Sequence, residues 1–124
     1  MKHTLIAFIL FIIFHSVYAQ NAAIVLTTKQ FDKKQQIQLA ELEGWVFKEG
    51  SSPDWADPDF DDRNWKPSKP IELTTKLADE SGRVEVWFRI KIQLDESFKN
   101  ISLGISRQLW AATDVYVDGT CVAK

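Results

Sequence analysis

The stretch RVEVWFRIKIQLD, residues 83–95, decides the fold class of this chain. Apolar residues occupy its even positions, whereas charged or polar residues occupy the odd positions apart from Trp87. A period of two is typical of a β-strand with one buried face and one solvated face. The pattern therefore predicts a single long strand, with Trp87 and Arg89 on its polar face. The apolar positions are Val84, Val86, Phe88, Ile90, Ile92 and Leu94.

Segments on both sides of this stretch also predict β structure. Residues 44–48 are expected to form a short strand closed by Glu49-Gly50, and residues 101–105 alternate apolar with small residues. Residues 114–117 and 120–123 flank Asp118-Gly119. Asp-Gly between two β-prone runs predicts a hairpin turn, because both central turn residues need positive φ. No helical period appears after the N-terminal segment, so we expect an all-β, antiparallel sandwich.

The N-terminus has the pattern of a targeting segment. A basic start precedes the apolar run Leu5–Phe14, and Val17-Tyr18-Ala19 offers the small residues that signal peptidase reads. The run is shorter than the roughly 20 residues that span a bilayer. We expect cleavage after Ala19 and export to the periplasm or the cell exterior, and an uncleaved anchor is the alternative. The expected divisions are a signal peptide at 1–19, a spacer at 20–36 and the β-sandwich at 37–124.

Composition limits the classes of function. The chain has 124 residues and a formal net charge of −2, with both signs spread along it, which argues against a nucleic-acid partner. Its histidines, His3 and His15, both lie in the expected signal peptide. The mature chain then lacks Ser-His-Asp chemistry and most transition-metal sites. We expect no catalytic residues, no cofactor and no metal. Cys121 is the single cysteine, which excludes a disulfide within the chain, and we expect its thiol to be buried.

The stretch SSPDWADPDFDDRNWKP, residues 51–67, raises the question of a cation site. Asp57, Asp59 and Asp61 have the i, i+2, i+4 spacing that opens an EF-hand loop. Such a loop needs glycine at its sixth position and glutamate at its twelfth, where this chain has Asp62 and Ser68. The EF-hand interpretation therefore fails, and an irregular calcium site remains as the alternative.

A structural role is the interpretation that we favour for this stretch. Three aromatic residues, Trp55, Phe60 and Trp65, recur at intervals of five and are expected to point inward. Aspartates such as Asp61 and Asp62 are expected to cap turns and accept hydrogen bonds from nearby N–H groups.

Five residues form the candidate ligand-binding set. A flat aromatic ring beside a guanidinium or amide group suits a sugar, which offers an apolar face and hydroxyl groups. The alternative is structural: Trp110 covers the end of the core, and Arg89 pairs with a neighbouring acid. The candidate residues are Trp87, Arg89, Arg107, Gln108 and Trp110.

Two strings of residues resemble a known family. The first, residues 45–50 followed by 54–65, has the form W-x-F-x-x-G … W-A-x-P-x-F-D-D-x-x-W. The second joins Val86-Trp87-Phe88-Arg89 to AATDVYVDG at 111–119. Both resemble galactose-binding-like jelly-roll modules. The combination is most similar to the extracytoplasmic N-terminal module of Bacteroidetes-type sensor histidine kinases, which is related to the sugar-binding domain of family 2 glycoside hydrolases.

The resemblance implies a jelly-roll β-sandwich that binds a small molecule or carbohydrate and signals to membrane-bound domains of the same protein. Family members usually carry further strands after such a hairpin, so we expect the sandwich to be incomplete at its C-terminus. Kinase activity would belong to other parts of the protein. Two alternatives stay open: an accessory sugar-binding domain of an exported glycoside hydrolase, and a structural module without a ligand.

Overall fold

A computed structural model describes residues 22–31, 36–106 and 112–124 of the chain. These residues form short strands joined by turns and short 3₁₀ helices, of which the longest, η3, has four residues. The expected signal peptide lies outside the described residues. The strands are β1 (Ile24–Leu26), β2 (Val46–Glu49), β3 (Lys66–Pro67), β4 (Val86–Arg89), β5 (Ile92–Leu94), β6 (Val115–Val117) and β7 (Thr120–Ala123). The 3₁₀ helices are η1 (Thr28–Gln30), η2 (Leu39–Glu41), η3 (Pro53–Ala56), η4 (Pro70–Glu72), η5 (Thr75–Leu77) and η6 (Glu96–Phe98).

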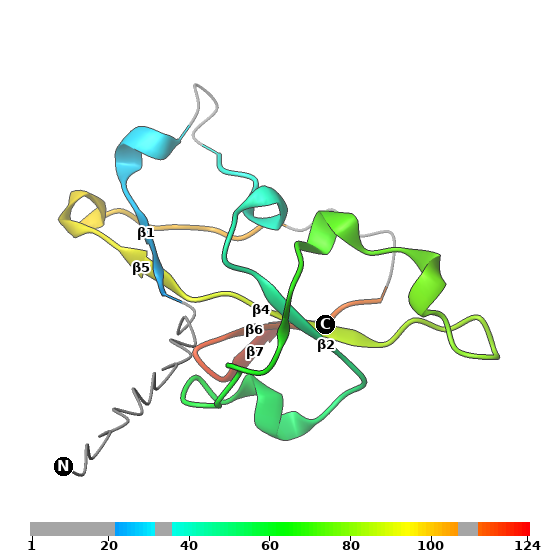
Figure 1. The fold of residues 1–124 in the computed structure, drawn as a ribbon. Coiled ribbons are helices and arrows are strands. Elements are labelled where there is room, and N and C mark those ends of the chain that lie inside the picture. The colour runs from blue at the N-terminus through cyan, green and yellow to red at the C-terminus, as the bar shows by residue number, and fades with distance from the viewer. Residues whose placement is uncertain (1–21, 32–35, 107–111) are drawn as a thin grey trace, which may run out of the picture.

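The strands form three small sheets (Figure 1). β2 lies between β3 and β4 in an antiparallel sheet, β6 and β7 form a hairpin, and β1 pairs with β5. The described residues are therefore β-rich, as expected, but they do not form a closed sandwich. The purely antiparallel expectation is wrong, because β1 and β5 run parallel. Across the described ranges, no helix is long and apolar enough to cross a membrane.

The single strand expected over residues 83–95 is divided at Ile90 and Lys91. Its first part, β4, pairs with β2, whereas its second part, β5, pairs with β1. The two parts follow different partners because β1, which lies in the segment expected as a spacer, supplies its own ladder and buries Leu26 to 3% exposure. The amide of Ile24 donates to the carbonyl of Lys91 over 2.8 Å at the start of this ladder.

The strand expected over residues 101–105 does not form. Residues 101–106 lie in no strand, and the side chains of Ile101, Leu103 and Ile105 are about half exposed. An alternating sequence becomes a strand only where a neighbouring strand takes up its backbone hydrogen bonds, and the sheets of the described residues include none at this position.

The expected hairpin is confirmed. Asp118 and Gly119 have φ values of 46° and 80°, so both central turn residues are left-handed as a two-residue hairpin requires. The ladder pairs Val117 with Thr120 and Tyr116 with Cys121. Cys121 is half-buried, whereas we expected it to be buried. A two-stranded hairpin covers each of its faces only where another segment packs on it.

The expected division into one buried and one solvated face is not seen within β4, where all four residues are half-buried. The register pairs Val46 with Arg89 and Lys48 with Trp87, so these four side chains share one face, because residues directly opposite in a ladder point the same way. This nominally polar face carries Val46, which is only 3% exposed. On the other face, Phe47 and Phe88 stack at 5.8 Å but stay half-buried. The reason is the loop that follows β2, which covers the Arg89 face.

Candidate functional site

Residues 51–65, between β2 and β3, form a loop that we call the aspartate loop. Gly50 directly precedes the loop with a φ of 95°, and its amide donates to the carbonyl of Glu85 over 2.8 Å. The loop then forms η3, with Pro53 in the first turn, where its missing N–H is no loss. These features turn the chain back over the Arg89 face of the sheet.

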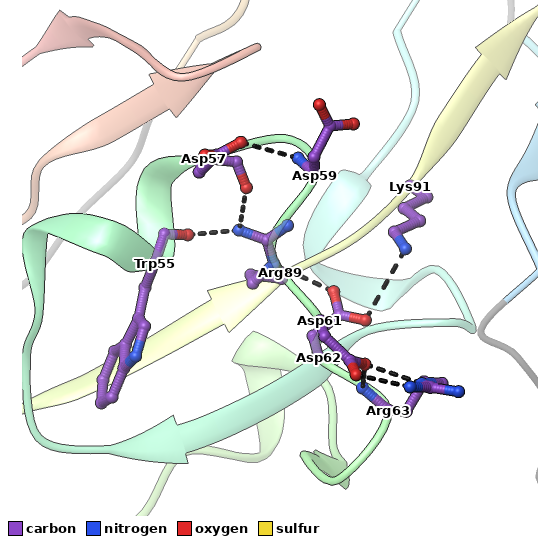
Figure 2. A network of polar contacts seen from close by, with 8 residues as sticks. All are labelled: Trp55, Asp57, Asp59, Asp61, Asp62, Arg63, Arg89 and Lys91. Atoms are coloured by element: carbon purple, nitrogen blue, oxygen red, sulfur yellow. Dashed lines mark hydrogen bonds and ion pairs between the residues drawn. The ribbon is translucent and has the colours of Figure 1, made fainter.

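The side chain of Arg89, on β4, lies at the centre of the contacts that hold the aspartate loop (Figure 2). Its Nε donates to Asp62 Oδ2 over 2.9 Å, and its Nη1 donates to the carbonyl oxygens of Trp55 and, over 3.1 Å, Asp57. Its guanidinium also lies 5.7 Å from the ring centre of Phe60 and 5.9 Å from that of Trp65. One side chain from β4 therefore fixes backbone and side-chain groups along most of the loop.

Asp62 is the only carboxylate of the loop that is buried, at 2% exposure. Besides Arg89, it has Lys91 as a neighbour, with Nζ 3.7 Å from Oδ1. Burying a carboxylate is costly unless it is paired and hydrogen-bonded, and the two cations from the β4–β5 segment supply that compensation. Within the described part of the chain, no buried side-chain nitrogen or oxygen lacks a hydrogen-bond partner.

Two further aspartates of the loop, Asp57 and Asp61, hold local turns. Asp57 Oδ1 accepts from the amide of Asp59 over 2.8 Å. Asp61 accepts from the Arg63 amide over 3.2 Å and from its guanidinium at 2.8 and 2.6 Å. These bonds, the side-chain ones above all, lower the pKa of Asp61 to about 2. Among the described residues, no group of three or more histidine, cysteine, aspartate or glutamate side chains is arranged to hold a metal ion.

A series of ring contacts leads from the interior of the loop to the hairpin. Trp65, which is 6% exposed, meets Phe60 at 6.0 Å and Trp55 at 5.1 Å, both edge to face. Trp55 then meets the ring of Trp87 at 6.0 Å and 88°. Trp87 stacks on Tyr116 of β6 at 5.2 Å and 28°. The three aromatic residues of the loop thus pack against one another and against β4.

The outer end of this series carries both aromatic and polar groups. Trp87 Nε1 donates to Ser51 Oγ over 3.2 Å, and Lys48 Nζ lies 5.0 Å from the ring centre of Trp55. Tyr116 is 37% exposed. We call Trp87, Tyr116, Ser51 and Lys48 the aromatic ledge. Sequence reasoning missed Tyr116, Ser51 and Lys48 here. Pairing of the two expected strands would have pointed to Lys48, because a residue directly opposite Trp87 lies on the same face of the sheet.

The candidate ligand-binding residues have different positions in the structure. Trp87 and Arg89 lie two residues apart on the same face of β4, but at least two nitrogens of Arg89 are directed into the loop. Trp87 lies at the surface end. Arg107, Gln108 and Trp110 are outside the described residues.

Two open hollows lie away from the aspartate loop. One, of about 420 Å³, lies between the start of β2 and η4, and Lys69 pairs there with Glu43, which raises the pKa of Lys69. The other is an apolar groove of about 440 Å³ beside the hairpin. Its lining residues are Leu103, Ile105, Val115, Val117, Val122 and Ala123. Comparisons with protein-family models, curated proteins and solved structures find no match to this chain.

Proposed function

We propose that this chain is the extracytoplasmic sensing or ligand-binding module of a membrane-bound sensor histidine kinase, built as a galactose-binding-like jelly roll. The observation that carries the proposal is that the two strings of residues on which the family resemblance rests are in contact. They are separated by about twenty residues in the chain.

Three contacts join the strings. Arg89 of the second string binds Asp62 of the first, with 2.9 Å between nitrogen and oxygen. Trp87 and Tyr116, both of the second string, stack on each other, and Trp87 also meets Trp55 of the first. A side chain at Gly119 would lie 3.2 Å from Pro58, so the hairpin turn reaches the aspartate loop. A shared motif whose parts support one another favours a common fold over coincidence.

The aromatic ledge is the surface that suits a ligand within this proposal. Tyr116 is 37% exposed and stacks on Trp87, whose indole donates to the hydroxyl of Ser51, and the ammonium of Lys48 lies over the neighbouring ring of Trp55. Such a surface accepts a small molecule or a sugar ring, which combine flat apolar faces with hydroxyl groups. Arg107, Gln108 and Trp110 remain proposed ligand-binding residues.

The signalling role is tested in cells that express the gene. Antibodies against residues 36–124 should detect a membrane-associated polypeptide much larger than 14.2 kDa that takes up acid-labile phosphate from ATP. Cells in which the gene is deleted are the control. A secreted product no larger than this chain would contradict the proposal, and a large product that hydrolyses glycosides without phosphorylation would favour the hydrolase alternative.

Ligand binding is tested separately on the isolated chain. Tryptophan fluorescence is titrated with a panel of monosaccharides and oligosaccharides, and Trp87→Leu should weaken any binding. Trp45→Phe is the matched control, because Trp45 lies on the opposite face and its indole donates to the carbonyl of Leu39. If the two substitutions weaken binding equally, the ligand does not bind at the aromatic ledge.

A further inference from the structure

The β6–β7 hairpin has no backbone ladder to the rest of the described chain. β6 and β7 pair with each other and with no other strand of the described sheets. Its position therefore depends on side-chain and turn contacts. Two of these are the stacking of Tyr116 on Trp87 and the approach of Gly119 to the aspartate loop.

Both contacts lead to parts of the structure that Arg89 holds. A Cβ at Gly119 would lie 3.2 Å from Pro58 Cδ and 3.5 Å from the carbonyl of Ala56. Those two residues alternate along the chain with Trp55 and Asp57, whose carbonyls both accept from the Arg89 guanidinium. The hairpin turn thus lies against the same backbone segment, residues 55–58, whose carbonyls bind Arg89.

The stacking of Tyr116 on Trp87 also connects the hairpin to Arg89. Trp87 stacks on Tyr116 and also meets the ring of Trp55 in an edge-to-face arrangement. The carbonyl of Trp55 is itself bound by Arg89. A shift of this backbone segment therefore changes the support of the turn and the setting of Trp87 together.

We call the hydrogen bonds from Arg89 to Asp62 and to the carbonyls of Trp55 and Asp57 the Arg89 clamp. We infer that the aspartate loop is a coupling element, through which a change in this clamp changes the position of the β6–β7 hairpin. The inference goes beyond the proposed function, since it needs no ligand. Because coupling between two sites is reciprocal, displacing the hairpin also disturbs the clamp. A partner that displaces the hairpin therefore changes the contacts of Arg89, and a change in the contacts of Arg89 displaces the hairpin.

The test uses the ring of Tyr116 as a reporter of hairpin position. The whole chain is labelled with 3-fluorotyrosine, and Tyr116→Phe identifies its ¹⁹F signal, because Tyr18 is the only other tyrosine. Trp87→Leu gives the signal of an unstacked ring. Arg89→Lys keeps the charge but cannot span both carbonyls and Asp62, since lysine lacks the guanidinium fork. We expect it to move the Tyr116 signal most of the way toward the unstacked value.

Arg63→Lys is the matched control, because Arg63 pairs with Asp61 on the outside of the same loop. We expect it to leave the Tyr116 signal unchanged. If Arg89→Lys also leaves the signal unchanged while Trp87→Leu moves it, the position of the hairpin does not depend on Arg89 and the inference is overturned.

A second variant approaches from the hairpin and leaves the clamp residues intact. Gly119→Ala introduces a Cβ against Pro58, and we expect it to shift the ¹⁵N signal of Arg89 Nε. This readout decides the question even where Arg89→Lys does not fold. A displaced Tyr116 signal with an unchanged Arg89 signal in Gly119→Ala would overturn the coupling.

Discussion

Replacing Arg89 by methionine should destabilise the fold more than any other charge removal in the described chain. The methionine keeps an apolar stem but leaves Asp62, at 2% exposure, without its main cation, and it strips the Trp55 and Asp57 carbonyls of a donor. Breaking a buried pair on one side costs about 3–5 kcal/mol. Lys91 remains 3.7 Å from Asp62, so we expect the lower end, about 3 kcal/mol. That is a large part of the roughly 5–15 kcal/mol that stabilises a typical domain.

The assay is urea unfolding followed by tryptophan fluorescence, with the free energy taken by linear extrapolation. Arg63→Met is the control, because its side chain is 58% exposed and an exposed ion pair contributes little, so the midpoint should shift far less than in Arg89→Met. The double variant Arg89→Met with Asp62→Leu should recover part of the loss, since the unpaired carboxylate is gone. A loss below about 1 kcal/mol for Arg89→Met, or a double variant less stable than the single one, would refute the reasoning.

Three further predictions concern the loop and the turns. Gly119→Ala should cost about 1–3 kcal/mol in urea unfolding and more than Gly82→Ala, because both glycines have φ near 80° but only Gly119 faces neighbouring atoms. Equal losses would argue against that contact. Trp65→Ala should cost about 3–5 kcal/mol, as expected for a buried aromatic, and a smaller loss would show that the loop repacks. The ¹³C carboxyl titration of Asp61 should have its midpoint near 2, and Arg63→Gln should return it toward 3.8. Because the folded pKa is the lower one, this pair stabilises the fold above about pH 4 and loses that contribution as the pH falls toward 2.

The features that sequence predicts well are those fixed by neighbouring residues. Asp118-Gly119 specifies its hairpin because a two-residue turn needs two left-handed residues, and both are present in the chain at that point. β2 likewise forms within two residues of the strand expected at residues 44–48. In each case the deciding interactions span only a few residues, so the sequence pattern contains them.

The features that sequence predicts poorly depend on partners far along the chain. Asp61 and Asp62 are identical neighbours, yet one is exposed and the other is buried. What separates them is Arg89, twenty-seven residues away. The same contact covers the face of β4 that was expected to be solvated, so that both faces are half-buried. Alternation identifies the apolar face but not which face a loop will cover. The division of residues 83–95 has a similar origin in the distant β1.

The two candidate ligand residues of β4 therefore need different treatment in any binding study. Trp87 lies at the ledge, where its loss removes ring contacts and one hydrogen bond to Ser51. Arg89 lies beneath the loop, with its side chain 12% exposed, and its loss leaves a buried carboxylate unpaired. An Arg89 variant that fails to bind thus reports first on the loop, whereas a Trp87 variant that keeps its stability reports on the ligand surface. Measuring unfolding and binding on both variants separates the two roles, and the family resemblance alone does not.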